Sequence, residues 1–282
     1  MHWKSQVKKG LKLLLSKRPI HTSAQIVNLS PSELLEGRRA LVTGGTSGIG
    51  YSIAEAFLKA GASVIITGRN QERIDKTVAT LRCYGEIYGY VLDNSDVASF
   101  EVTFKKMTEN NKVVDILVNN AGILGAVLPN AKEEDYDLIL NTNLKGAFFL
   151  SQMIGKYMKE KQIKGNILNI ASSSSLRPAV SAYTISKWGL RGLTMGLAKV
   201  LSPYGITVNG LAPGPTATPM LKKSGDNITN DDIPLGRFIM PEEIANMAVF
   251  LVSEMGRSII GDIVYMTGGA GVVTYEDMRY NF

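Results

Sequence analysis

The sequence is poor in the residues that build disulfide frameworks and metal clusters. One cysteine, Cys83, and two histidines stand among 282 residues. A single cysteine excludes an internal disulfide and a cysteine-based metal cluster, so we predict no metal site and a reducing compartment. We expect Cys83 to be a buried structural thiol.

Long apolar runs are also missing. The run at residues 13–15 is far shorter than the roughly 20 residues needed to cross a bilayer. No small-residue cleavage site follows a proper apolar core, so neither a membrane span nor a secretory signal is expected.

Charge of one sign accumulates only near the N-terminus. Residues 1–32 contain six basic side chains and no acid, although the chain as a whole has 31 basic and 25 acidic residues. The remainder is therefore neutral, and nucleic acid is not an expected partner.

The N-terminal segment has the pattern of a basic amphipathic helix. Apolar residues recur at spacings of three and four beside lysines, namely Trp3, Val7, Leu11, Leu14 and Leu15. We assign residues 1–35 to an N-terminal extension that packs on the body or on a twin subunit, contacts a membrane surface through residues 1–20, or is a mitochondrial transit peptide. Because transit peptides favour arginine and only Arg18 is present, a cytoplasmic location is favoured over a mitochondrial one.

From residue 36 to 282, apolar β-rich runs alternate with helical patterns and no internal repeat interrupts them. This alternation predicts one α/β domain, a Rossmann fold with a doubly wound parallel sheet of seven strands. Ligands bind such sheets outside the carboxyl ends of the strands. The expected strands are Arg39–Thr43, Ser63–Thr67, Ile87–Leu92, Val114–Asn119, Asn166–Ala171, Ile206–Leu211 and Asp262–Met266.

A glycine-rich turn, Thr43–Gly50, follows the first predicted strand and leads into a helical pattern. Glycines allow a tight turn and bring backbone N–H groups close to a pyrophosphate at the positive end of the helix. The order strand, turn and helix therefore predicts a dinucleotide site.

The second predicted strand ends in Gly68 and Arg69, where an NAD site usually has a carboxylate. A guanidinium can pair with a 2′-phosphate, so Arg69 favours NADP(H) over NAD(H), unless it only caps a solvated loop. Asp93 and Asn94 follow the third strand and could contact an adenine edge or form an Asx turn. Asn119–Gly122 follows the fourth strand, where small residues let the chain pass close to a ribose.

Tyr183 and Lys187 are four residues apart in the predicted helix Ala182–Leu201, so their side chains are neighbours. A nearby ammonium should lower the pKa of a tyrosine, which is about 10 in free peptides, and make it a usable proton donor. The preceding strand ends in Ser172–Ser175, where a hydroxyl could hold a carbonyl oxygen or simply belong to a flexible loop.

Taken in order, Thr43–Gly50, Asn119–Gly122, Asn143, Ser172, Tyr183-x-x-x-Lys187 and Pro213-Gly214 resemble the short-chain dehydrogenase/reductase family over roughly residues 36 to 270. The stretches at residues 234–238 and 241–245 are similar to its oxoacyl-reductase branch. The resemblance implies that Tyr183 exchanges the proton, Lys187 lowers its pKa and binds the nicotinamide ribose, Ser172 orients the carbonyl, and Asn143 holds a relay water.

The resemblance also implies a cofactor site. The expected cofactor-binding residues are Gly44, Thr46, Ser47, Ile49, Gly50, Arg69, Asp93, Asn94, Asn120, Ala121, Gly122, Tyr183, Lys187, Pro213, Thr216 and Thr218. Because Ser172 lies slightly closer to Tyr183 than is common in the family, Ser173 or Ser174 could take its role.

The expected activity is hydride transfer between NADP(H) and a carbonyl or secondary alcohol, with reduction of a 3-oxoacyl group on an acyl carrier protein as a narrower alternative. A nucleotide-binding scaffold without catalysis is the rival class, and intact Ser172, Tyr183 and Lys187 argue against it. Residues 122–129, 176–180 and 218–238 should select the small-molecule substrate. The resemblance implies a homodimer or homotetramer.

Overall fold

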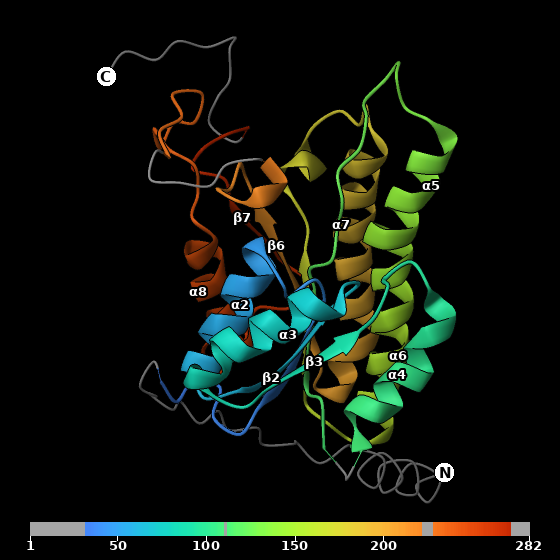
Figure 1. Cartoon of the computed structure of the whole chain (residues 1–282), viewed down its shortest axis with the longest axis vertical. Helices are drawn as coiled ribbons and strands as arrows, with labels where there is room; N and C mark the ends of the chain where they lie inside the picture. Colours follow the sequence, from blue (N-terminus) through green and yellow to red (C-terminus); the bar gives the residue numbers. More distant parts are fainter. Residues whose placement is uncertain (1–31, 110–111, 222–227, 272–282) are drawn as a thin grey trace, which may run out of the picture.

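A computed structural model describes residues 32–109, 112–221 and 228–271 (Figure 1). One parallel sheet with the strand order β3-β2-β1-β4-β5-β6-β7 crosses the described part, which confirms the predicted doubly wound Rossmann fold. The amphipathic pattern at residues 1–20 lies outside the described residues. The strands are β1 (Arg39–Val42), β2 (Ser63–Gly68), β3 (Ile87–Val91), β4 (Ile116–Asn119), β5 (Asn166–Ile170), β6 (Thr207–Pro213) and β7 (Ile263–Met266).

The central strands are buried on both faces, which explains their continuous apolar sequences. Every residue of β1, β4, β5 and β6 is buried. In β1, Ala40 and Val42 belong to one core cluster, and Leu41 between them belongs to the other. Because successive side chains of a strand point to opposite faces of the sheet, alternate residues pack into two separate cores.

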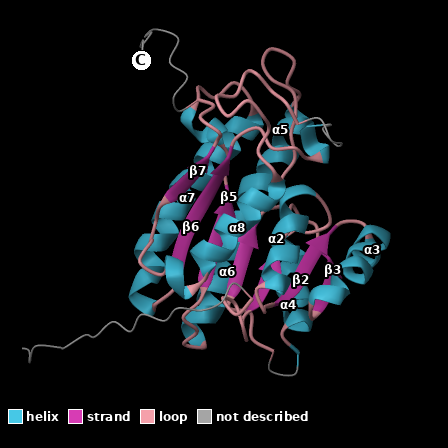
Figure 2. Ribbon diagram, turned by 90° about the vertical axis from the view of Figure 1, so that its left-hand side faces the viewer, coloured by secondary structure: helices cyan, strands magenta, loops and turns pink. Residues whose placement is uncertain are grey.

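Helices cover both faces of the sheet. Figure 1 shows α2, α3 and α8 on one side and α4, α6 and α7 on the other, and Figure 2 shows α2 and α8 across the near face. The α-helices are α2 (Gly48–Lys59), α3 (Gln71–Leu81), α4 (Phe100–Met107), α5 (Glu133–Leu140), α6 (Gly146–Glu160), α7 (Ala182–Leu201) and α8 (Pro241–Val252). No helix in the described ranges has the length and apolar character of a membrane span.

A wide π-helical turn, Asn141–Lys145, joins α5 to α6 without a break in helical structure. Its residues Thr142 and Asn143 are buried. Such turns insert one extra residue into a helix and are often found at functional sites.

Two expectations at the edges of the fold differ from the structure. Cys83 is exposed, so its prediction as a buried thiol was wrong: it lies in the short 3₁₀ turn Arg82–Tyr84, which contains no buried residue. Leu35, assigned to the extension, is fully buried, and its N–H donates to Ala60 O at 2.8 Å. The packed body therefore begins before residue 36.

Candidate active site

A cavity of about 670 Å³ opens at the carboxyl ends of the strands, where the topology predicts a ligand site. Loops that follow six of the strands line it. Of the residues predicted to form the site, those that line the cavity are Gly44, Thr46, Ser47, Ile49, Arg69, Asp93, Asn94, Asn120, Ala121, Gly122, Ser172, Tyr183, Lys187, Pro213, Thr216 and Thr218. Gly50 and Asn143 lie behind its wall.

The N-terminus of α2 faces the cavity and is open to an anion. Its N-cap residue, Ser47, makes no side-chain capping bond, and the first turn contains no acidic residue. Gly44 and Gly48 adopt positive φ angles of 64° and 54°, which turn the chain tightly from β1 into the helix. Unpaired N–H groups and the helix dipole together fit a pyrophosphate at this position.

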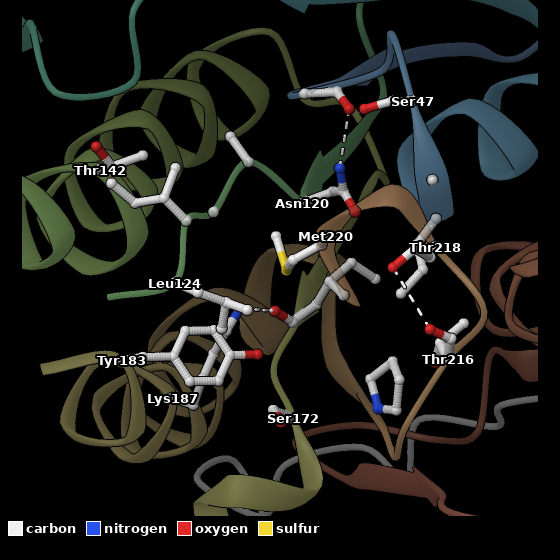
Figure 3. A pocket seen from close by; sticks show the side chains of 18 of the residues that line it. Ser47, Asn120, Leu124, Thr142, Ser172, Tyr183, Lys187, Thr216, Thr218 and Met220 are labelled. Carbon is white, nitrogen blue, oxygen red and sulfur yellow. Dashed lines mark hydrogen bonds between the residues drawn. The ribbon is translucent and has the colours of Figure 1, made fainter. Parts of the chain in front are cut away.

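Gly50 fixes the distance between two loops of the site. A Cβ at Gly50 would lie 2.4 Å from both Asn120 Nδ2 and Gly44 O. Asn120 Nδ2 donates to Thr43 O at 2.9 Å. It also donates to Gly44 O at 3.2 Å (Figure 3). Gly50 thus lets the Asn120 amide hold the glycine-rich turn against the loop after β4.

Two arginines line the cavity beyond β2. Arg69 directly follows the strand, and Arg73 lies in the first turn of α3, which Asn70 caps by accepting from Arg73 N–H at 2.8 Å. Arg73 was not predicted from the sequence, although its position four residues after Arg69, at the start of a helix, could have indicated it.

The Asp93 side chain forms an Asx turn, one of the two alternatives that the sequence offered, and contact with an adenine edge stays a prediction. Asp93 Oδ1 accepts from Ser95 N at 2.9 Å and from Ser95 Oγ at 2.7 Å. Burial would raise the pKa of Asp93, but these hydrogen bonds and the charge of Arg69 outweigh it and hold the pKa below its ordinary value. The amide of Asn94 donates to Thr142 O at 3.1 Å, so that group ties two loops together.

Tyr183 and Lys187 lie side by side at the other end of the cavity, as their helical spacing predicts (Figure 3). Ser181 begins α7 by accepting from Thr184 N at 3.1 Å. Lys187 is 4% exposed, its Nζ donates to Ile170 O at 2.7 Å, and Nζ lies 5.5 Å from the centre of the Tyr183 ring. Burial lowers the pKa of Lys187 to about 8.

The expected lowering of the tyrosine pKa was wrong for the surroundings that this chain provides. Burial raises the pKa of Tyr183 above its ordinary value, and the neighbouring Ser172 hydroxyl lowers it by a smaller amount. Among the three candidate serines, Ser172 is the one whose hydroxyl acts on the pKa of Tyr183. Ser173 and Ser174 line the cavity as well, and Ser174 N donates to Ser172 Oγ at 3.1 Å.

Asn143 pairs with the backbone of Ile123, a residue of the cavity wall. Its Oδ1 accepts from Ile123 N at 2.8 Å, and its Nδ2 donates to Ile123 O at 3.0 Å and to Ser186 Oγ at 3.2 Å. The side chain therefore fixes the loop after β4, and its predicted role in holding a water stays a prediction.

The substrate end of the cavity has an apolar wall that the sequence indicated only as ranges. Its members come from the loops after β4 and β6, namely Leu124, Val127, Met220 and Leu221. Arg177, which follows β5, also lines this end. Among the described residues, no three His, Cys, Asp or Glu side chains gather as metal ligands do.

Comparisons with known proteins agree with this geometry. Residues 44–271 match a family model described as enoyl-(acyl carrier protein) reductase. The 3-oxoacyl-[acyl-carrier-protein] reductase FabG of Thermotoga maritima is 38% identical over 242 residues, which cover 83% of this chain and 98% of that protein.

Solved structures give the same result. A short-chain type dehydrogenase/reductase from Mycobacterium marinum has a TM-score of 0.79 at 29% sequence identity. The match covers 84% of this chain and 97% of the Mycobacterium marinum chain. A gluconate 5-dehydrogenase from Burkholderia cenocepacia, solved with NADP and tartrate, has a TM-score of 0.78 at 31% identity, covering 85% and 97%. The chain belongs to the short-chain dehydrogenase/reductase family of oxidoreductases.

Proposed function

We propose that this protein reduces a carbonyl group to an alcohol with NADPH, and catalyses the reverse oxidation with NADP⁺. One observation carries the proposal: Ser172, Tyr183 and Lys187 meet at one end of a cavity whose other end has an open helix N-terminus and two arginines. A panel of ketones and aldehydes, followed by loss of NADPH absorbance, tests it. If the protein binds NADPH but reduces none of these compounds, the result would favour a nucleotide-binding scaffold without catalysis.

The cavity residues fit this cofactor. The uncapped N–H groups of α2 would hold the pyrophosphate, Arg69 and Arg73 would pair with the 2′-phosphate, and Lys187 would contact the nicotinamide ribose. When bound, NADPH supplies the hydride. Pro213, Thr216 and Thr218 would position the nicotinamide carboxamide.

Side chains of the protein would supply the proton that the reduction needs. Ser172 Oγ donates a hydrogen bond to the carbonyl oxygen and holds it beside Tyr183, whose hydroxyl gives up its proton as negative charge develops on that oxygen. The Lys187 ammonium stabilises the resulting phenolate. A tyrosine with its ordinary pKa of about 10 is already protonated at neutral pH, as reduction requires, and burial raises the pKa of Tyr183 further.

The cofactor preference depends on the two arginines beyond β2. We expect Arg69→Ala to weaken NADPH binding by about tenfold and to leave NADH binding nearly unchanged, because one charge-assisted contact with a phosphate is lost. The double variant Arg69→Ala/Arg73→Ala should weaken NADPH binding further than Arg69→Ala alone. Titrations followed by nicotinamide fluorescence measure both constants.

Arg82→Ala is the matched control, since Arg82 is exposed at the far end of α3 and does not line the cavity. An equal loss of NADPH and NADH affinity in Arg69→Ala would show that Arg69 does not recognise the 2′-phosphate.

Reduction of a 3-oxoacyl group on an acyl carrier protein is a second candidate. The identity to the Thermotoga maritima protein and the description of the matching family model favour it. Reduction of acetoacetyl-CoA would support this candidate, whereas an enzyme that acts on small free ketones or sugars should not reduce it.

We also propose that the protein is a homodimer or homotetramer. Exposed apolar side chains gather on α5, α6 and α7, which lie together on one side of the molecule (Figure 1), and they include Leu138, Phe148, Phe149, Trp188 and Met195. Exposed apolar area of this kind marks protein interfaces.

Phe149→Glu should therefore shift the mass measured by light scattering toward the monomer, because a buried charge disfavours the interface. The same change at Val102, an exposed residue of α4, serves as the control. A wild-type protein that is monomeric at micromolar concentration would refute the proposal. Membrane contact through residues 1–20 and a cytoplasmic location remain predictions from the sequence.

A further inference from the structure

Charged side chains divide the cavity into two regions. Arg69, Arg73 and Asp93 line it beyond β2 and β3, where the cofactor's adenosine end is proposed to lie. Lys187 is buried beneath the reacting end and donates to a backbone carbonyl. Among the described residues of the lining, Arg177 is the one exposed charge at the substrate end, and no carboxylate balances it there.

The backbone of Arg177 is held at a set distance from the reacting groups. Ser172 is the N-cap and Arg177 the C-cap of the 3₁₀ turn Ser173–Leu176. Arg177 N donates to Ser174 O at 3.1 Å, and Arg177 O accepts from Trp188 Nε1 at 2.9 Å. Because a 3₁₀ helix rises about 2 Å per residue, the Cα atoms of Ser172 and Arg177 lie about 10 Å apart.

No described residue forms an ion pair or a side-chain hydrogen bond with the Arg177 guanidinium. None of the ion pairs within residues 32–109, 112–221 and 228–271 involves Arg177. The backbone of Gly271 packs beside it: a Cβ at Gly271 would lie 2.9 Å from Nη2 and 3.0 Å from Nε. Glycine at this position therefore leaves room for the guanidinium at the mouth of the cavity.

Part of the wall of the cavity that Arg177 lines is apolar. Leu124, Val127, Met220 and Leu221 line the cavity, and each is more than 40% exposed. Such side chains can cover a short carbon chain but cannot neutralise a charge. A molecule with a carbonyl near Tyr183 and an anionic group a few bonds away would match both features.

We propose that Arg177 is a specificity-determining residue that binds an anionic group, a carboxylate or a phosphate, on the carbonyl substrate. This inference rests on the proposed reductase function and narrows its substrate to small oxoacids or phosphorylated ketones. The planar guanidinium can hold either group with two parallel hydrogen bonds.

Paired substrates test the assignment. Initial rates of NADPH oxidation are measured for levulinate against methyl levulinate and for dihydroxyacetone phosphate against dihydroxyacetone, with wild type, Arg177→Gln and Arg177→Lys. We expect Arg177→Gln to lower kcat/KM for the anionic member of one pair by about tenfold, mainly through KM, and to leave the neutral member unchanged. Arg177→Lys should retain part of the preference, and the pair that responds identifies the anion.

Arg191→Gln is the matched control: Arg191 stacks on Trp188 at 5.4 Å and donates to Ser175 O at 3.4 Å, but it does not line the cavity. Equal losses for charged and neutral members in Arg177→Gln would overturn the inference and leave the reductase function intact. The inference would also be overturned if the wild-type protein reduced only the neutral member of each pair. If wild type binds NADPH and reduces no carbonyl of the panel, both the function and this inference fail.

Discussion

Replacing Tyr183 with phenylalanine is expected to lower kcat for carbonyl reduction by about 10²- to 10⁴-fold, which is the usual contribution of a positioned general acid. The hydroxyl is the group that delivers the proton, and Ser172 beside it cannot replace it because its pKa is far higher. The aromatic ring keeps its place in α7, so NADPH affinity and Tm should stay close to those of wild type. Stopped-flow reduction and a thermal melt measure the two effects.

Tyr265→Phe provides the control, because the Tyr265 hydroxyl lies 3.4 Å from Ser175 Oγ and outside the cavity. If Tyr183→Phe kept more than about a tenth of the wild-type kcat, Tyr183 could not be the principal proton donor.

Lys187→Met is expected to abolish most of the activity and to raise the stability of the fold. The difference between 10.5 and about 8 in the pKa of Lys187 corresponds to about 3 kcal/mol that burial of the ammonium costs at neutral pH. Loss of the hydrogen bond to Ile170 O offsets part of the gain. A net gain of about 1 kcal/mol would raise Tm by about 2–4 °C.

The pH dependence gives this prediction a sign. Below pH 8 Lys187 is charged in both the folded and the unfolded chain, so burial has its full cost. Between pH 8 and 10.5 the unfolded chain binds more protons than the folded one, and wild-type stability therefore rises with pH. The advantage of Lys187→Met should be largest below pH 8 and shrink above it.

Lys199→Met, at an exposed position on the same helix, should change neither activity nor Tm. A lower Tm for Lys187→Met at pH 7 would mean that the hydrogen bond to Ile170 outweighs the cost of burying the charge. Wild-type reduction should also slow above pH 8, as the ammonium that stabilises the phenolate loses its proton.

The sequence predicted those parts of the fold and site that depend on local periodicity. The seven strands appeared within a few residues of their expected ends, because each combines an apolar run with a polar or glycine-rich boundary. Tyr183 and Lys187 were placed together by helical geometry alone, and α7 has the predicted bounds Ala182–Leu201. The motifs at the strand ends gather around one cavity because the carboxyl ends of parallel strands lie at the same edge of the sheet.

Properties set by distant parts of the chain were not predictable in this way. The direction of the Tyr183 pKa depends on how deeply the loops bury the hydroxyl, and spacing along a helix contains no such information. Cys83 could be placed only once the turn after α3 was known to face solvent. The pairing of Asn143 with Ile123 joins two elements whose relative positions no local pattern specifies.

The π-helical turn between α5 and α6 divides one continuous helix into two halves with different rotational phase. One added residue rotates every later side chain by about 100° around the helix axis, so the apolar stripe of α6 can face the sheet while α5 keeps its own orientation. Deleting a single residue from Asn141–Lys145 would cancel that rotation. Either Asn143 would lose Ile123, or Leu150 and Ile154 would turn out of the core, so this short segment should tolerate substitutions better than changes in length.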